Sequence, residues 1–125
     1  MFGRARRRRR RAPAPKHYRT YKEQARRVIL QKVEQYIAFY GFQLGRISIR
    51  NQRTRWASCS EKGNLNFSYK ILFLPDQLSD YIVVHELCHL RELNHSTRFW
   101  ELVAKTFPDY KERRKALRNS WRVYA

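Results

Sequence analysis

The spacing of apolar residues divides the chain into a long helix, a block of short strands and a group of later helices. Between positions 18 and 40 apolar side chains recur every three or four residues, namely at Val28, Ile29, Val33, Tyr36, Ile37 and Tyr40. This period is typical of an amphipathic helix that turns one face toward a core. Gly41 follows directly and is suited to end such a helix.

After Gly41 the apolar pattern changes to an alternation with period two. Ile47 and Ile49 alternate with polar neighbours, a second extended run covers 54–59, and a third covers 64–71 after a turn. Three short strands joined by tight turns predict a small antiparallel sheet. Two roles stay open for the stretch 64–69: a sheet edge that pairs with an extended peptide, or an interior strand without a free edge.

The second half of the chain is predicted to be helical. Pro75 is suited to an early helical position, and the segment after it is apolar on more than one side, which indicates a buried helix. Ser96 can cap a further helix that ends by Pro108, and 109–123 form a last helix. The predicted fold is therefore α+β, with a small sheet packed against the N-terminal helix and the helix after Pro75, followed by C-terminal helices.

The distribution of charge along the chain indicates a separate segment at the N-terminus. The 125 residues include 28 Lys+Arg and 10 Asp+Glu, for a net charge of +18. Residues 1–16 hold seven Arg and one Lys without any acid. Such a segment cannot bury apolar surface and repels itself, so we expect a disordered Arg-rich arm over 1–16 and one domain over 17–125. The arm is suited to bind nucleic acid or another polyanion.

The lengths of the apolar runs and the number of cysteines indicate the cellular compartment in which we expect the protein. We find neither an apolar run of the roughly 20 residues that cross a bilayer nor a signal peptide after the N-terminal arginines. Cys59 and Cys88 are the only cysteines, too few for a disulfide scaffold. We therefore expect a cytoplasmic protein without a membrane partner.

The helix predicted after Pro75 contains the pattern H-E-x-x-H. His85 and His89 lie one helical turn apart on the same face and can bind one metal ion. Glu86 lies about 100° around the helix, so it flanks the ion as a candidate general base. Two histidines that interrupt a buried apolar helix, with a third at His95, are poorly explained as core residues. One Zn²⁺ ion fits best, since it accepts three nitrogen ligands and keeps a position for water.

The third metal ligand must come from outside this pair. His95 would lie about 15 Å from His85 along an unbroken helix, so it can bind the ion only if the helix ends first. Asn94 tolerates a left-handed conformation, and we predict the break there. Glu92 and Glu101 are the competing ligands, and Glu92 is better suited to a position outside the ligand set or on the surface.

Four further residues near these motifs are candidates for chemistry. Cys88 borders the metal face, yet a thiolate ligand would close the site, so we expect a small buried core residue. A donor that stabilises the oxyanion is normally needed, and Tyr69, Arg53 and Arg55 are weak candidates for it.

The run from His85 through His95 to Trp100, preceded by Arg55-Trp56-Ala57-Ser58-Cys59 and by Leu74-Pro75, resembles the YgjP-like metallopeptidase domain. That family is related to the SprT-like and WLM peptidases. The similarity extends from about Ile47 to Leu117. It implies a zincin-like fold, a zinc ion held by His85, His89 and His95, and Glu86 as the catalytic glutamate. Ala57 departs from the family's usual glycine.

Three functions from different classes follow as expectations. The leading one is a zinc-dependent metallopeptidase that hydrolyses peptide bonds of a peptide or protein substrate with a zinc-bound water activated by Glu86, acting near nucleic acid as SprT-like relatives do. The second is a zinc-dependent hydrolase of a nucleotide or another phosphorylated substrate. The third is a nucleic-acid-binding module with a structural zinc, which the open coordination position disfavours.

Overall fold

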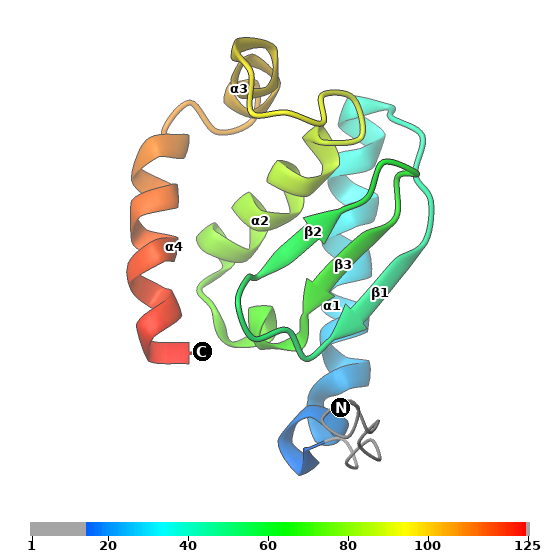
Figure 1. Ribbon diagram of the computed structural model, residues 1–125, viewed down its shortest axis with the longest axis vertical. Helices are drawn as coiled ribbons and strands as arrows, with labels where there is room; N and C mark the ends of the chain where they lie inside the picture. Colours follow the sequence, from blue (N-terminus) through cyan, green and yellow to red (C-terminus); the bar gives the residue numbers. More distant parts are fainter. Residues whose placement is uncertain (1–14, 125) are drawn as a thin grey trace, which may run out of the picture.

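The structure is a computed structural model that describes residues 15–124. In chain order the elements are α1 (Lys16–Tyr40), β1 (Ile47–Arg50), β2 (Ala57–Cys59), β3 (Leu65–Ser68), the 3-10 helix η2 (Tyr69–Phe73), α2 (Asp76–Cys88), α3 (Thr97–Ala104) and α4 (Tyr110–Tyr124). Figure 1 shows the small sheet against α1 and α2, with α4 on the far side of α2. The predicted α+β class is confirmed.

The N-terminal helix is present as predicted. Ala25, Ile29 and Val33 recur every four residues and are buried along one face of α1. Gly41 ends the helix in a left-handed conformation with a φ of 70°, and its N–H donates to the carbonyl of Ile37 at 2.7 Å. The Arg-rich arm lies outside the described residues except for Pro15 and Lys16, and Lys16 already begins the helix.

The sheet is mixed, so the prediction of an antiparallel sheet is wrong for one pair of strands. The strand order is β1-β3-β2, with β2 antiparallel to β3 and β1 parallel to it. A hairpin turn containing Gly63 at φ 83° joins β2 to β3 and makes them antiparallel. Because β3 lies between β1 and β2, the segment 51–56 that joins β1 to β2 passes across the end of β3. The prediction had assumed that successive strands are neighbours.

The sequence left two roles open for 64–69, a sheet edge that pairs with a peptide or an interior strand, and the central position of β3 decides between them. Leu65 and Phe67 are fully buried, and β3 has a hydrogen-bonded strand on each side. It is therefore an interior strand without a free edge. The strand with a free edge on the α2 side is β2.

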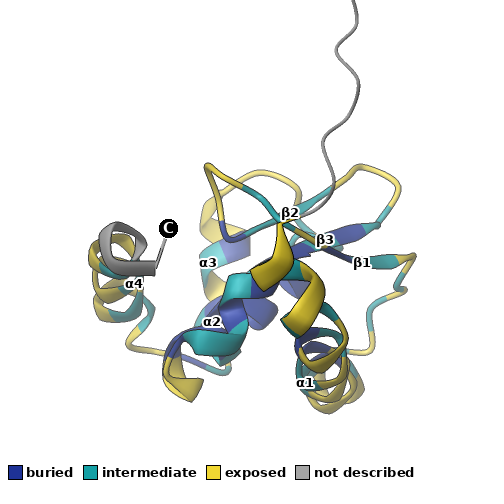
Figure 2. Cartoon of the chain, turned by 90° about the horizontal axis from the view of Figure 1, so that it is seen from below, coloured by how far each residue is buried: buried dark blue, intermediate teal, exposed yellow. Residues whose placement is uncertain are grey.

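Helix α2 lies between two hydrophobic clusters, as the apolar pattern indicated. Ile82, Val83 and Leu87 pack into the cluster formed with α1 and the sheet. Tyr81, Val84 and Cys88 pack into a second cluster with α3 and the segment before α4. Figure 2 shows this buried helix between more exposed elements. No helix within residues 15–124 is long and apolar enough to cross a bilayer.

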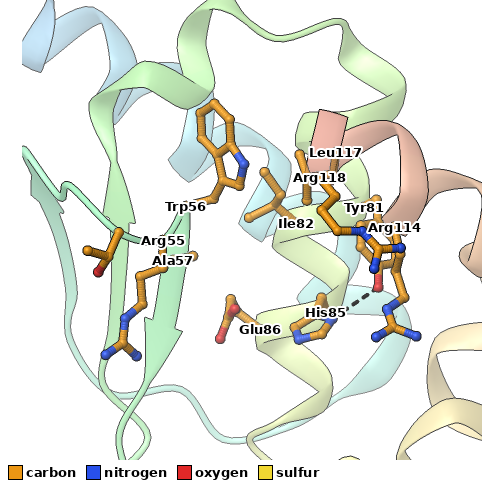
Figure 3. A pocket seen from close by; sticks show the side chains of 11 residues that line it. Arg55, Trp56, Ala57, Tyr81, Ile82, His85, Glu86, Arg114, Leu117 and Arg118 are labelled. Carbon is orange, nitrogen blue, oxygen red and sulfur yellow. Dashed lines mark hydrogen bonds between the residues drawn. The ribbon is translucent and has the colours of Figure 1, made fainter. Parts of the chain in front are cut away.

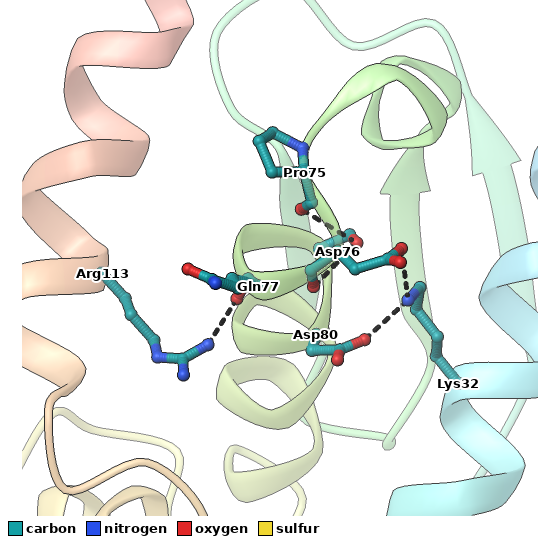
Figure 4. A network of polar contacts seen from close by, with 7 residues as sticks. Lys32, Pro75, Asp76, Gln77, Asp80 and Arg113 are labelled. Atoms are coloured by element: carbon teal, nitrogen blue, oxygen red, sulfur yellow. Dashed lines mark hydrogen bonds and ion pairs between the residues drawn. The ribbon is translucent and has the colours of Figure 1, made fainter.

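Polar contacts hold the first turns of α2 to the neighbouring helices. The ammonium group of Lys32 on α1 lies 2.6 Å from a carboxylate oxygen of Asp80 and 3.2 Å from one of Asp76. On the other side, Arg113 of α4 donates to the carbonyl of Gln77 at 2.7 Å. Figure 4 shows that these contacts approach α2 from opposite sides. They position the helix that carries the H-E-x-x-H residues.

Candidate metal centre

Three imidazole rings converge at the end of α2. The Nε2 atom of His95 lies 3.0 Å from Nε2 of His89 and 3.2 Å from Nε2 of His85. An ion bound tetrahedrally by nitrogen atoms at about 2.0–2.1 Å would separate those nitrogens by roughly 3.3 Å. The cluster therefore has the size that one divalent ion needs. Among the described residues it is the one group of at least three His, Cys, Asp or Glu side chains close enough to hold a metal.

His95 reaches the other two rings because α2 ends earlier than we predicted. The helix ends at Cys88 with His89 as its C-cap, and no described residue other than glycine has a positive φ, so the break at Asn94 is wrong. Short turns follow instead, in which the N–H groups of Leu90 and Arg91 donate to the carbonyls of Leu87 and Cys88. These turns need no left-handed residue and fold the chain back toward α2.

The segment after the turns confirms the predicted cap. The hydroxyl of Ser96 accepts a hydrogen bond from the N–H of Phe99 at 3.3 Å and begins α3. His95 thus immediately precedes the N-cap of α3. This position directs its ring toward His85 and His89.

The outer nitrogens of two rings have hydrogen-bond partners. The Nδ1 atom of His89 lies 3.0 Å from the carbonyl of Glu92, and a carbonyl only accepts, so Nδ1 carries the proton and Nε2 has a free lone pair. The Nδ1 atom of His85 lies 3.1 Å from the hydroxyl of Tyr81. Such partners fix ring orientation at metal sites. Sequence reasoning missed Tyr81, although its position four residues before His85 places it on the same helical face.

Aromatic side chains cover the outer faces of the rings. Phe99 stacks on His89 with centroids 4.4 Å apart, and Trp100 stacks on His95 at 5.7 Å. Their helical spacing in the sequence predicts a core position for both. Phe99 is fully buried, but Trp100 is only partly buried and forms one wall of the site.

The surroundings of the three histidine rings lower their pKa values. Burial lowers the pKa of His85 to about 3, and the nearby His89, His95 and Arg114 lower it further. The pKa values of His89 and His95 are also lowered, chiefly by burial. Neutral imidazole is the form that binds a metal ion.

The carboxylate of Glu86 lies beside the rings and is nearly buried, with 7% of its surface exposed. Burial raises its pKa to about 8, against the opposing effect of the positive charge on Arg55. Within residues 15–124 its carboxylate has no hydrogen-bond partner. A group of this kind is available to exchange a proton with a ligand.

Two hollows meet at this carboxylate. One, of about 440 Å³, extends toward α4, and the other, of about 470 Å³, extends toward His95. Arg55, Ala57, His85 and Glu86 border both hollows. Figure 3 shows the first hollow, with Glu86 directed from α2 toward the strand that carries Ala57. Together they form a groove beside the free edge of β2.

The three candidate oxyanion donors lie in different parts of the structure, and only one of them borders the hollows. Tyr69 packs in the first hydrophobic cluster, and its hydroxyl bonds to Nδ1 of His17 at 2.7 Å. Neither Tyr69 nor Arg53 lines the two hollows, whereas Arg55 lines both.

The competing ligands also lie outside the histidine cluster. Glu92 contributes its main-chain carbonyl to His89, and Glu101 lines a hollow between α3 and the end of α1. Cys88 is fully buried in the second cluster, and burial raises the pKa of its thiol to about 12. This agrees with its predicted role as a core residue.

Comparison with known proteins identified one family and several similar structures, among them two metallopeptidase zymogens. The family model described as YgjP-like, metallopeptidase domain, matches residues 4–120, a longer stretch than the resemblance in the sequence, and therefore includes α1. The zymogen of the metallopeptidase abylysin from Pyrococcus abyssi has 28% identity and a TM-score of 0.68, covering 74% of this chain and 93% of its own. The zymogen of jannalysin from Methanocaldococcus jannaschii has 21% identity and a TM-score of 0.65, covering 74% and 95%. A comparison with curated proteins found no match.

Proposed function

Since the chain belongs to the YgjP-like metallopeptidase family and is a peptide-bond hydrolase, we propose that it works with one zinc ion held by His85, His89 and His95. The convergence of the three Nε2 atoms beside a buried carboxylate is the observation that carries this proposal. Three neutral nitrogen ligands with open space beside them are typical of catalytic zinc. When bound, zinc supplies a Lewis acid that polarises a carbonyl group and lowers the pKa of water.

Glu86 is the general base of this proposal. Its carboxyl group borders both hollows, and the charge of a bound ion would lower its raised pKa and favour the ionised form that accepts a proton from water. It takes a proton from the attacking water and returns it to the amine that leaves.

The peptide substrate lies in the groove along β2 in this proposal. Residues 57–59 pair with β3 on one side only, so their outward N–H and carbonyl groups are available to an extended chain. Such pairing brings a peptide bond past Glu86. Arg55, which borders both hollows, is the nearest candidate among the three proposed oxyanion donors.

The variant Glu86→Gln tests the activity. We expect cleavage of casein to fall by about a hundredfold or more, since general base catalysis typically contributes about 10²–10⁴. Zinc content, measured by mass spectrometry of the purified protein, is expected to stay near that of the native protein. Glu101→Gln is the matched control, because Glu101 lines a different hollow. Full activity in Glu86→Gln would contradict the assigned base.

Hydrolysis of a nucleotide is the second candidate, and the arginines that line the first hollow favour it. The same pair of variants assayed on nucleoside triphosphates separates the two activities. A structural zinc in a nucleic-acid-binding module is the weaker third candidate, because the second hollow is lined by all three histidines and leaves open space beside them. It predicts nucleic-acid binding that Glu86→Gln leaves intact and no native hydrolysis.

The Arg-rich arm of residues 1–16 brings the enzyme to nucleic acid or another polyanion in this proposal. Its support is the charge of the segment, which has no acid to neutralise seven Arg and one Lys. We also propose a reducing, cytoplasmic setting. Both cysteines, Cys59 and Cys88, are free thiols.

A further inference from the structure

The hollow between β2 and α4 combines an apolar wall with exposed positive charge. Trp56, Ile82 and Leu117 line it from three different parts of the chain, and the first two are buried. Arg55, Arg114 and Arg118 line it as well, and all three are exposed. Figure 3 shows Arg114 and Arg118 beside His85, with Arg55 across the hollow near Glu86. A ligand in this space would therefore meet cationic groups close to the proposed reacting centre.

These arginines lack acidic partners within residues 15–124. The ion pairs of that region join Arg26 to Glu23, Lys32 to Asp76 and Asp80, and Arg113 to Asp109. Arg114 and Arg118 are separated by four residues on α4 and so project from one face. The one acid that lines the hollow is Glu86, to which the proposed mechanism assigns another role.

The neighbouring Arg113 on the same helix differs from Arg114 and Arg118, because its side chain bonds to other groups of the fold. Its guanidinium bonds to Asp109 at 3.0 Å and to the carbonyl of Gln77 at 2.7 Å, and it lies over the ring of Phe107. Its hydrogen-bonding capacity is largely used within the fold. Arg114 and Arg118 have no such hydrogen bonds in the described part of the chain.

Stacking holds Arg114 without using its N–H groups. The guanidinium carbon lies 4.5 Å from the ring centroid of Trp100, and Trp100 stacks on Tyr110 at 4.8 Å. A stacked guanidinium keeps its edge free to bind a carboxylate with two parallel hydrogen bonds. Trp100 also stacks on His95, so this arginine is held next to the metal centre.

We propose that the hollow is a substrate subsite in which Arg114 and Arg118 bind a carboxylate of the peptide close to the cleaved bond. The apolar wall receives the aliphatic part of the same residue. The carboxylate can belong to a Glu side chain or to the C-terminus of a short peptide. This inference rests on the proposed peptidase function and names the substrate class of that site.

Cleavage of matched peptides provides the first test. A pool of peptides carrying Glu or Gln near each bond is digested, cleavage sites are located by mass spectrometry, and kcat/KM is then measured for the best Glu and Gln pair. We expect the native enzyme to favour the Glu peptide by about tenfold, because charge-assisted bidentate bonds are strong. In the double variant Arg114→Gln, Arg118→Gln the ratio falls to about one, mainly through KM. Lys111→Gln, which removes an exposed charge of α4 outside the hollow, is expected to keep the native ratio.

Binding provides a second test that needs no turnover. Fluorescein-labelled peptides with Glu or Gln, each with a free or an amidated C-terminus, are titrated into Glu86→Gln protein with and without the two arginine substitutions. Tighter binding of the Glu peptides identifies a side-chain carboxylate, and tighter binding of the free C-terminus identifies the terminal one. Either preference is expected to disappear without Arg114 and Arg118.

The possible results distinguish failure of the proposed subsite from failure of the proposed peptidase function. Carboxylate binding that depends on the arginines, without cleavage of any peptide, contradicts the function and supports the subsite. Cleavage without a carboxylate preference in either assay, or a preference that Lys111→Gln abolishes equally, overturns the subsite. Tighter arginine-dependent binding of a phosphoserine peptide or ATP than of the Glu peptide overturns it in favour of a phosphate ligand.

Discussion

The hydroxyl of Tyr81 lies 3.1 Å from Nδ1 of His85. Tyr81 precedes His85 by one turn of α2. Tyr81 packs among Val84, Phe99 and Phe107 with only 2% of its surface exposed, which restricts the position of its hydroxyl. Burial raises the pKa of this phenol well above its usual range, which keeps it protonated. The contact therefore fixes one ring of the histidine cluster from within the hydrophobic core.

Tyr81→Phe removes this contact while it preserves the ring that packs in the core. We expect zinc affinity to fall by about tenfold or more, since loss of a partner that orients a metal-bound histidine typically costs about 10–100-fold. Competition with a fluorescent zinc chelator measures the change. Tyr40→Phe is the control, because its hydroxyl bonds to Leu102 and Thr106 instead. Equal losses in both variants would indicate a general effect on the fold.

His95→Ala tests the third ring of the cluster. We expect bound zinc to fall from about one ion per chain to a small fraction, because two imidazoles alone do not form a stable site. Elemental analysis after dialysis against a weak chelator gives the stoichiometry. His17→Ala removes a histidine that bonds to Tyr69 outside the site, and it is expected to retain the ion. Retention of zinc in His95→Ala would contradict the proposed ligand set.

The sequence predicted which residues the fold brings together at the site better than it predicted the local backbone there. His85, Glu86 and His89 were placed correctly because a helix with a fixed period relates them. The path to His95 was mispredicted, since overlapping turns after Cys88 carry no signature residue such as a left-handed Asn or Gly. The alternating pattern identified strands, but it contained no information on which strands are neighbours. The parallel pairing of β1 with β3 depends on the burial of β3 in the middle of the sheet.

The arginines of α4 illustrate a second limit. In the sequence, Arg113, Arg114 and Arg118 are equivalent basic residues of one predicted helix, a pattern that is usually typical of a solvated face. Their surroundings differ only after α4 packs beside α2, when Arg113 meets Asp109 and Gln77 and the other two face the hollow. Such differences arise from tertiary packing and leave no local pattern.

Lys32→Met tests how α1 holds the helix of the site. The Lys32 side chain is 14% exposed and pairs with Asp80 at 2.6 Å, so its loss leaves a partly buried carboxylate without its cation. We expect the free energy of unfolding to fall by about 1–2 kcal/mol in urea titrations. The double variant Lys32→Met, Asp80→Leu is expected to recover part of this loss. Lys111→Met, at an exposed position on α4, serves as the control with little expected change.

Removal of residues 1–14 tests the role of the Arg-rich arm. These residues carry seven Arg and no acid, so they can neutralise several phosphates and release the counterions of a nucleic acid. We expect affinity for single-stranded DNA to fall and its dependence on salt to weaken, by about 0.7 in the logarithmic slope for each lost phosphate contact. Fluorescence anisotropy over a range of salt concentrations gives this slope. Cleavage of a short uncharged peptide by the shortened chain should stay near the native rate, because α1, the sheet and the histidine cluster all begin after residue 14. An unchanged salt slope would exclude the arm as the polyanion-binding element and leave the folded domain to account for any binding.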